Sequence, residues 1–485
     1  MKKYIFKIGL LISFFTFFSC EDELTNNPYN AVSDGELFSS PEGFTNAVRG
    51  IYAGFIDNGP GVGTDNLSDY YNGPMFSVPD ILSDNVIINQ NGRQSKRTLY
   101  DWLYNSNGYS SFDLYGDAYK IVRKANNIIG HIDNLTDGPF KDNIRGEALT
   151  ARALAHFDLV RTYGQIPTQS GGAGASLGVA YITVVDPLQK PSRNTVDEVY
   201  TNIIADLTTA EGLISSSGGT DRFNRNTVNA LLSRVYLYMG QWQNAVAAAN
   251  NVSASVASRA NFPGIWKDEN ADGIVSQFLI RIIDDVAIGT QFSQTSPASG
   301  VRSEYVVSYD FYQMFSNNDI RKTAYISTSP FSDIEYNHIS KYFGKTGQNN
   351  NIVNAKIFRM AEVMLNKAEA LAELGGQDAE ALAALDAIRS HRYSGFTTGS
   401  EAGQSLKDAI ALERRLELAF EGHRFYDLKR KGLSINRDAT FGDAADGSGV
   451  APTFAILASD DHRFQLPIPQ DAINANTNLV QNPGY

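Results

Sequence analysis

The first feature that suggests chemistry is a serine between two glycines. Residues 174–178, Gly-Ala-Ser-Leu-Gly, match the GxSxG motif of serine hydrolases. In those enzymes a strand leads into the serine and a helix follows it. Here a Gln-Ser-Gly-Gly-Ala stretch precedes the motif and a short Val/Tyr/Ile run follows. The surroundings therefore argue against Ser176 as a nucleophile.

A second feature has the oxygen ligands of a calcium loop. Asp268, Asn270 and Asp272 alternate along the chain and Gly273 follows them, as at the start of an EF-hand. The twelfth position of that loop requires a glutamate, and this chain has Leu279 there. Two interpretations stay open, an Asn/Asp/Gly hairpin turn and a Ca²⁺ site completed by other residues.

A third feature is a row of carboxylates. Glu413, Glu417 and Glu421 are spaced four residues apart, so they share one face of a helix. Paired carboxylates can perform acid/base catalysis, but these three alternate with apolar residues and have arginines close by in the sequence. We therefore favour a buried ion network in which the arginines are the partners: Arg414, Arg415 and Arg424.

The composition excludes several classes of protein. The chain has 485 residues, one cysteine and a formal net charge of −12. A single cysteine rules out an intramolecular disulfide and a cysteine-based zinc or iron–sulfur site. The six histidines are scattered, with no pair at metal-ligand spacing on a helix. The negative charge argues against nucleic acid as a partner, because phosphate binding needs basic surface.

The N-terminus has the features of a bacterial lipoprotein signal. Basic residues precede an apolar run at 9–18 that is too short to span a bilayer. The run ends at Cys20, in a relaxed lipobox. We expect residues 1–19 to be a signal peptide, Cys20 to be lipidated, and residues 20–37 to form an acidic tether. Cleavage removes three lysines and no acids, which changes the formal charge from −12 to −15. An ordinary signal peptide with an incidental cysteine is the alternative.

Helices dominate the elements that must position these groups. Apolar residues recur at helical spacing, and Thr195-x-x-Glu198 is a capping box. The predicted helices cover residues 41–55, 114–129, 144–162, 196–214, 228–238, 243–252, 361–374 and 379–392. Several pairs resemble tetratricopeptide (TPR) units, within about 113–253 and 355–430. Residues 278–283 predict a strand, and about 57–112 and 255–350 are expected to be rich in loops.

Four segments together resemble a known family. In chain order they are Phe44–Tyr52, Phe358–Ala370, Glu413–Arg430 and the C-terminal stretch from Leu466 to Tyr485. The set resembles the SusD/RagB family of outer-membrane nutrient-binding lipoproteins of Bacteroidetes. The resemblance implies a mainly α fold, in which TPR-like helix pairs carry large loop-rich insertions with a few short strands. It also implies a single domain over residues 38–485.

The resemblance implies a function as well. Members capture a glycan, or in some cases a peptide, and pass it to a SusC-type TonB-dependent transporter without catalysis. Glu21-Asp22-Glu23 resembles the signal that sends such lipoproteins to the cell surface. We therefore expect a lipid-anchored outer-membrane protein that faces the exterior. We expect it to need no cofactor, apart from a structural Ca²⁺ if the turn at 268–273 binds one.

Candidate ligand residues follow from the chemistry of sugars, which stack on exposed aromatic faces and need polar partners at the rim. Trp102 is the first candidate because it lies in a polar loop, with Asp101, Tyr104 and Asn105 beside it. The next candidates lie in two further loops: Tyr70 and Tyr71, then Phe292 and Arg302.

Three rival functions stay open. The first is a peptide-binding, RagB-like member of the family. The second is a glycoside hydrolase, because 53 carboxylates leave room for a pair at catalytic separation. The third is a TPR scaffold that assembles proteins and binds no nutrient.

Overall fold

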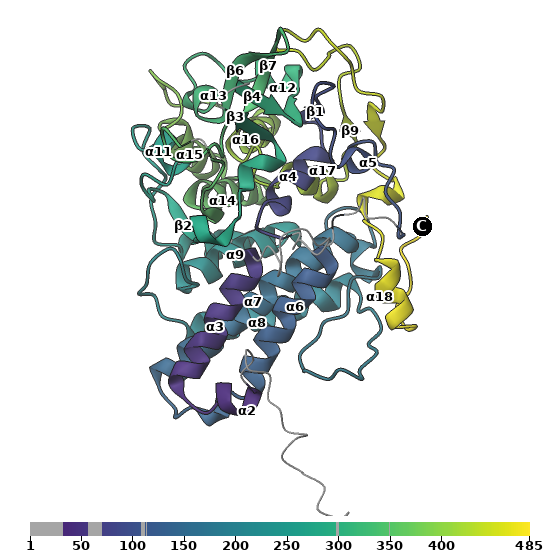
Figure 1. Ribbon diagram of the computed structural model, residues 1–485. Helices are drawn as coiled ribbons and strands as arrows, with labels where there is room; N and C mark the ends of the chain where they lie inside the picture. Colours follow the sequence, from purple (N-terminus) through teal and green to yellow (C-terminus); the bar gives the residue numbers. More distant parts are fainter. Residues whose placement is uncertain (1–32, 57–69, 108–111, 113, 297–299, 349) are drawn as a thin grey trace, which may run out of the picture.

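The structure, a computed structural model, describes residues 33–56, 70–107, 112, 114–296, 300–348 and 350–485. The predicted signal peptide, Cys20 and the acidic run at 21–23 lie outside these residues. Figure 1 shows two regions, a helical region that holds α2, α3 and α6–α9, and a region where strands and further helices mix. The fold is mainly α, as predicted.

The N-terminal half supplies the long helices, and each predicted one is present. Local signals explain their ends: Ser40 Oγ accepts from Gly43 N at the start of α3, and the capping box of Thr195 and Glu198 is formed at α8. The helices are α2 (Asp34–Leu37), α3 (Pro41–Ile56), α4 (Pro74–Ile81), α5 (Arg97–Tyr100), α6 (Leu114–Gly130), α7 (Pro139–Tyr163), α8 (Val196–Leu213), α9 (Arg225–Tyr238) and α10 (Trp242–Asn250).

The helices form a continuous array. Helix α7 packs against α6 and α8, and α9 packs against α10. Helix α10 then packs against α14, which contacts α15 and α16, so the two predicted groups of helix pairs join into one array. The C-terminal helices are α11 (Phe262–Ile265), α12 (Tyr309–Gln313), α13 (Ile320–Tyr325), α14 (Met360–Leu374), α15 (Asp378–Arg389), α16 (Gly403–Glu417), α17 (Arg424–Arg430) and α18 (Gln470–Ala475).

The strands are short and antiparallel. The largest sheet has the order β1-β5-β7-β6, with β1 Val86–Ile88, β5 Tyr305–Val307, β7 Ile334–Ile339 and β6 Ile326–Phe331. The remaining strands form pairs: β2 (Ile274–Phe278) with β8 (Ala355–Arg359), β3 (Ser293–Ser296) with β4 (Gly300–Ser303), and β9 (Ile435–Asn436) with β10 (Ile456–Leu457).

The strand predicted at 278–283 is misplaced. It runs from Ile274 to Phe278, because its partner β8 begins at Ala355, directly opposite Phe278. Beyond that point the chain turns into a 3₁₀ segment, and Ile282 and Ile283 are exposed to solvent. The apolar run therefore does not continue the strand.

The predicted carboxylate network exists, but with other partners. Glu417 is fully buried and binds Arg392 at 2.9 Å, Arg359 at 2.8 Å and Arg321 at 3.2 Å. These three cations lower the pKa of the Glu417 carboxyl against the effect of burial. A carboxylate held ionised in this way stabilises the scaffold and is unsuited to proton transfer.

The predicted pairing with Arg414, Arg415 and Arg424 is wrong. Arg414 binds Asp427, whereas Arg415 and Arg424 both bind Asp84. Helix α16 ends at Glu417, so Glu421 lies beyond the helix and does not share its face with Glu413 and Glu417. Each of the three arginines binds a carboxylate of another segment.

The C-terminal stretch is also part of the scaffold. The side chain of Asn482 accepts from Arg193 Nη2 at 2.8 Å and donates to the carbonyls of Tyr163 and Leu466. The side-chain amides of Asn476 and Asn478 donate hydrogen bonds to the carbonyls of Pro191 and Lys190, respectively. The tail therefore ties the end of α7 to the long loop that precedes α8.

Candidate functional site

Trp102, the first sugar-stacking candidate, is buried. Its exposed fraction is 2%, and its indole N–H donates to the Leu82 carbonyl at 2.9 Å. The guanidinium of Arg437 lies 4.0 Å from the ring centroid, so a cation of the protein itself covers an aromatic face. The prediction that Trp102 is exposed is wrong, because a residue distant in sequence completes its environment.

The neighbours of Trp102 are mostly turned inward as well. Tyr104 is buried and its hydroxyl donates to the Arg463 carbonyl. Asp101 is buried and accepts from Arg97 Nε at 3.0 Å. Asn105 is exposed, so it alone of this group remains available to a ligand.

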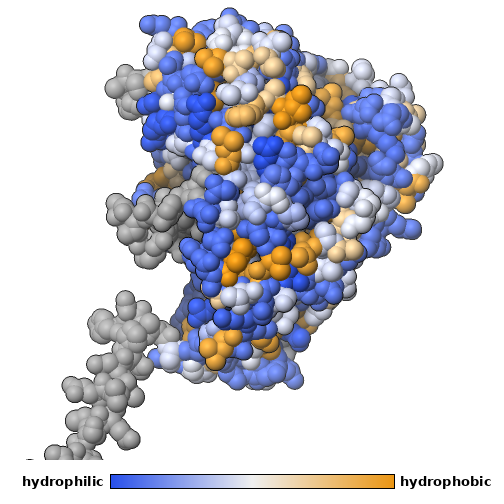
Figure 2. All heavy atoms as spheres, turned by 90° about the vertical axis from the view of Figure 1, so that its right-hand side faces the viewer, coloured by the Kyte–Doolittle hydropathy of each residue, from blue (hydrophilic) through white to orange (hydrophobic). Residues whose placement is uncertain are grey.

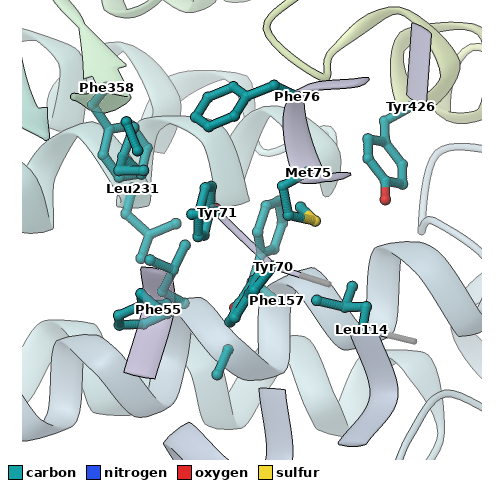
Figure 3. Close-up of a cluster of buried hydrophobic side chains, with 14 of the residues drawn as sticks. Phe55, Tyr70, Tyr71, Met75, Phe76, Leu114, Phe157, Leu231, Phe358 and Tyr426 are labelled. Atoms are coloured by element: carbon teal, nitrogen blue, oxygen red, sulfur yellow. The ribbon is translucent and has the colours of Figure 1, made fainter. Parts of the chain in front are cut away.

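The second pair, Tyr70 and Tyr71, belongs to the core. Both hydroxyls donate to Asp158 Oδ2 at 2.9 Å, and the two rings stack with centroids 4.8 Å apart. Figure 3 shows them packed among Phe55, Phe76 and other buried side chains. Burial, followed by the charge of Asp158, raises the pKa of both phenols. Neither ring is exposed, in contrast to the prediction.

The two residues of the third candidate pair, Phe292 and Arg302, differ in their exposure. Phe292 is fully buried and stacks on Tyr342, with an interplanar angle of 9°, so its predicted exposure is wrong. Arg302, on β4, is half-buried. Its Nε donates to the Asn91 carbonyl at 3.2 Å, and its guanidinium carbon lies 5.7 Å from the ring centroid of Phe331 on β6. Within the described residues the terminal nitrogens of Arg302 have no hydrogen-bond acceptor.

Three loop-rich segments meet around Arg302. Asn91 Nδ2 donates to the Tyr336 hydroxyl at 2.8 Å, which fixes the loop after β1 against β7. Arg93 pairs with Glu304 at 2.9 Å, which fixes the same loop against the residues that follow β4. We call this surface the Arg302 patch: Asn91, Arg93, Arg302 and Phe331. It offers one aromatic ring, two guanidinium groups and one side-chain amide.

A hollow of only about 10 Å³ lies in the same strand-containing region, among residues that the sequence did not indicate. Tyr309 and Phe441 are half-exposed and meet edge to face, with centroids 5.1 Å apart. Asp310 and Asp438 line the same hollow. Phe441 satisfies the criterion that selected Trp102, an aromatic residue in a polar loop, so that criterion applied to the 433–460 excursion would have found it.

Ser176 and the calcium-like turn are accounted for by protein contacts. No strand leads into Ser176; a 3₁₀ segment precedes it, and its hydroxyl donates to the Ala173 carbonyl.

In the calcium-like turn, Asp268 binds Lys356 at 2.7 Å, and Asp272 accepts from Ser258 and Asn261. Asn270 accepts from Asp272 N. In the described part of the chain no group of three or more His, Cys, Asp or Glu side chains is placed to hold a metal ion.

Other hollows exist away from the predicted residues. A cavity of about 530 Å³ lies between α6, the loop 180–191 and the C-terminal stretch. Figure 2, which faces the C-terminal side, shows mainly hydrophilic surface with separate hydrophobic patches. The hydroxyl of Tyr119 in this cavity is already bound to the Ala180 carbonyl. The lining of this cavity is mainly apolar. The Arg302 patch, which combines an aromatic ring with the unbound terminal nitrogens of Arg302, is therefore the better candidate for a polar ligand.

Comparison with known proteins identifies the family. Residues 324–485 match the model of the SusD family, and residues 62–237 match a model described as starch-binding associating with outer membrane. The two matches together cover more than half of the chain. The chain belongs to the SusD/RagB family. Among the described residues no helix is both long and apolar enough to cross a membrane.

Individual relatives agree with this assignment. SusD-like protein P2 of Formosa agariphila is 27% identical over the full length of both chains. A SusD superfamily protein of Bacteroides thetaiotaomicron is 27% identical, with a TM-score of 0.77 over 92% of this chain and 100% of that one. A putative sugar binding protein of Bacteroides vulgatus is 26% identical, with a TM-score of 0.76 over 92% and 98%.

Proposed function

We propose that this SusD/RagB protein is a non-catalytic, cell-surface lipoprotein that binds an oligosaccharide and delivers it to a SusC-type TonB-dependent transporter. The main support for this proposal is that the chain belongs to a family with starch-binding and sugar-binding relatives. The anchor is Cys20 and the orientation is toward the exterior. No cofactor is needed.

The Arg302 patch is the proposed contact surface. A sugar ring has an apolar face that packs on an aromatic side chain, and its hydroxyls need planar polar partners. Phe331 supplies the aromatic face, while the terminal nitrogens of Arg302 and the side-chain oxygen of Asn91 supply the polar groups. These side chains come from loops and strand ends on the scaffold described above, where binding residues are commonly found.

The same guanidinium suits a second ligand class. Arginine binds carboxylates through two parallel N–H···O bonds, so Arg302 would also receive the C-terminus or an acidic side chain of a peptide. Peptide binding is therefore the alternative function. A hydrolase is disfavoured at this surface, because the neighbouring Glu304 is engaged by Arg93 and by Ser95 N.

Affinity-gel electrophoresis tests the ligand class. The chain starting after Cys20 is run through gels that contain plant, fungal or host polysaccharides. Retardation by one polysaccharide without release of reducing ends supports the proposal. Absence of retardation in every gel, together with binding to a peptide library, supports the alternative. Release of reducing ends would show a hydrolase.

A further inference from the structure

A cavity at the other end of β6 is not part of the Arg302 patch. Its volume is about 400 Å³, within the usual range of about 300–1,000 Å³ for small-ligand pockets. Its walls come from α11 and the residues after it, from α13, from the start of β6 and from the loop 340–347. Ser327 in the cavity and Phe331 in the patch are four residues apart, or about 13 Å along the strand.

The cavity contains two lysines. Lys341 is 1% exposed, and its ammonium donates to Glu421 and to the Ala419 carbonyl, both at 2.7 Å. An ammonium has three donors, and the remaining side of the Lys341 ammonium faces the rings of Trp266 and Tyr325, whose centroids lie 4.0 and 3.8 Å away. Lys341 is therefore fully engaged by the protein. Lys267 is half-buried, and its ammonium has no hydrogen bond or ion pair within the described residues.

The remaining polar groups of the cavity also favour an acceptor-rich ligand. The side chains of Ser327 and Ser340 lie in its walls, whereas the hydroxyls of Thr323 and Thr346, also in the walls, donate to the Ile320 carbonyl and to Glu269. Trp266, also in the wall, has a buried indole N–H without a partner among the described residues.

Two of the three carboxylates around the cavity are paired with cations of the protein. Glu421 binds Lys341 and Arg359, and Asp268 binds Lys356. Glu269 accepts from the Thr346 hydroxyl at 2.8 Å. Lys267 forms no ion pair with any of these carboxylates within the described residues, so it is the cation of this cavity that is available to a ligand. The formal net charge of −15 expected for the mature chain opposes polyanions at long range, but at physiological salt that repulsion is screened beyond about 8 Å.

We propose that this cavity binds the anionic group of an acidic sugar unit, a carboxylate or a sulfate, with Lys267 as its main cationic contact. The anion would lie against the Lys267 ammonium, and the sugar hydroxyls would meet the hydroxyls of Ser327 and Ser340. The assignment of the anion to a sugar rests on the proposed function, whereas the binding of the anion itself does not.

Calorimetric titration of the full mature chain tests the proposal with three probes: glucuronate, galactose 6-sulfate and neutral glucose. We expect saturable binding of at least one acidic sugar and at least tenfold weaker binding of glucose. The substitution Lys267→Gln should weaken binding of the acidic sugar at least tenfold. The control Lys190→Gln, on an exposed loop, should leave it unchanged. The stronger of the two acidic probes distinguishes a carboxylate from a sulfate ligand.

Binding must also be separate from the Arg302 patch. Arg302→Gln should leave the affinity for the acidic monosaccharide within twofold, even if it abolishes retention on a polysaccharide gel. The proposal is overturned if neither acidic sugar binds, if glucose binds as tightly, or if Lys267→Gln has no effect. It is also overturned if Arg302→Gln removes the binding. Failure of this test leaves the polysaccharide gel result, and with it the proposed function, unaffected.

Discussion

The guanidinium of Arg302 lies 5.7 Å from the centre of the Phe331 ring, and its terminal nitrogens are not used by the described residues of the protein. Arg437 contrasts with it, because it lies 4.0 Å from the Trp102 ring and its nitrogens are taken up by backbone carbonyls. The two arginine–aromatic pairs look alike, but the first is half-exposed and the second is buried. This difference in exposure distinguishes the proposed binding surface from a part of the scaffold.

Trp102→Ala should destabilise the fold. Removal of a buried tryptophan leaves a cavity and an uncovered guanidinium, so we expect a loss of about 3–5 kcal/mol in the free energy of unfolding. Urea unfolding measures it. Phe140→Ala, at a side chain that is 44% exposed, is the matched control and should cost less than about 1 kcal/mol. A Trp102→Ala protein of unchanged stability would contradict the burial described here.

Glu417→Gln should also destabilise the protein strongly. The substitution removes the charge that Arg321, Arg359 and Arg392 share, and loss of one partner from a buried ion pair costs about 3–5 kcal/mol. Glu373→Gln breaks a more exposed pair with Lys407 and should cost about 0–1 kcal/mol. Equal effects of the two substitutions in urea unfolding would mean that the buried network adds nothing.

Asp80 should make the stability depend on pH. Burial raises the pKa of its carboxyl to about 7, although Asn85 and the amides of Gly422 and Phe420 oppose the shift. The folded state then binds more protons than the unfolded state between about pH 4 and 7, so the contribution of Asp80 to stability falls as the pH rises through that window.

Asp80→Asn removes this dependence. The stability of the variant relative to the wild type should therefore increase between pH 5 and pH 7.5, as measured by urea unfolding at both values. Asp408→Asn, at an exposed position, should show no such change. A relative stability that is constant with pH, or that decreases, would contradict the raised pKa.

The helices could be predicted from the sequence because their signals are local. Thr195 and Glu198 cap α8 with their own side chains, and the apolar spacing from Leu114 to Ile129 marks the buried face of α6. The candidate site could be predicted only in part, because exposure depends on distant residues. Arg437 covers Trp102 and Asp158 binds Tyr70. Each partner is distant in sequence from its aromatic residue, so no local pattern predicts the contact.

Cys20→Ser should release the protein from the membrane. Two or more acyl chains on Cys20 give stable anchoring, because each buried methylene contributes about 0.8 kcal/mol. In a Bacteroidetes host we expect the wild type in the outer-membrane fraction, accessible to protease on intact cells, and the variant in the soluble fraction. Membrane association retained by Cys20→Ser would contradict the proposed anchor.

The most direct test of the central claim is the affinity of the Arg302 patch for an oligosaccharide of the glycan that retards the protein in gels. Isothermal titration calorimetry would compare the wild type with Phe331→Ala and Arg302→Gln, and with the controls Phe140→Ala and Arg281→Gln. We predict that each patch substitution raises Kd at least tenfold, or about 1.4 kcal/mol, while both controls and the thermal stability stay unchanged. Wild-type affinity in both patch variants would contradict the account.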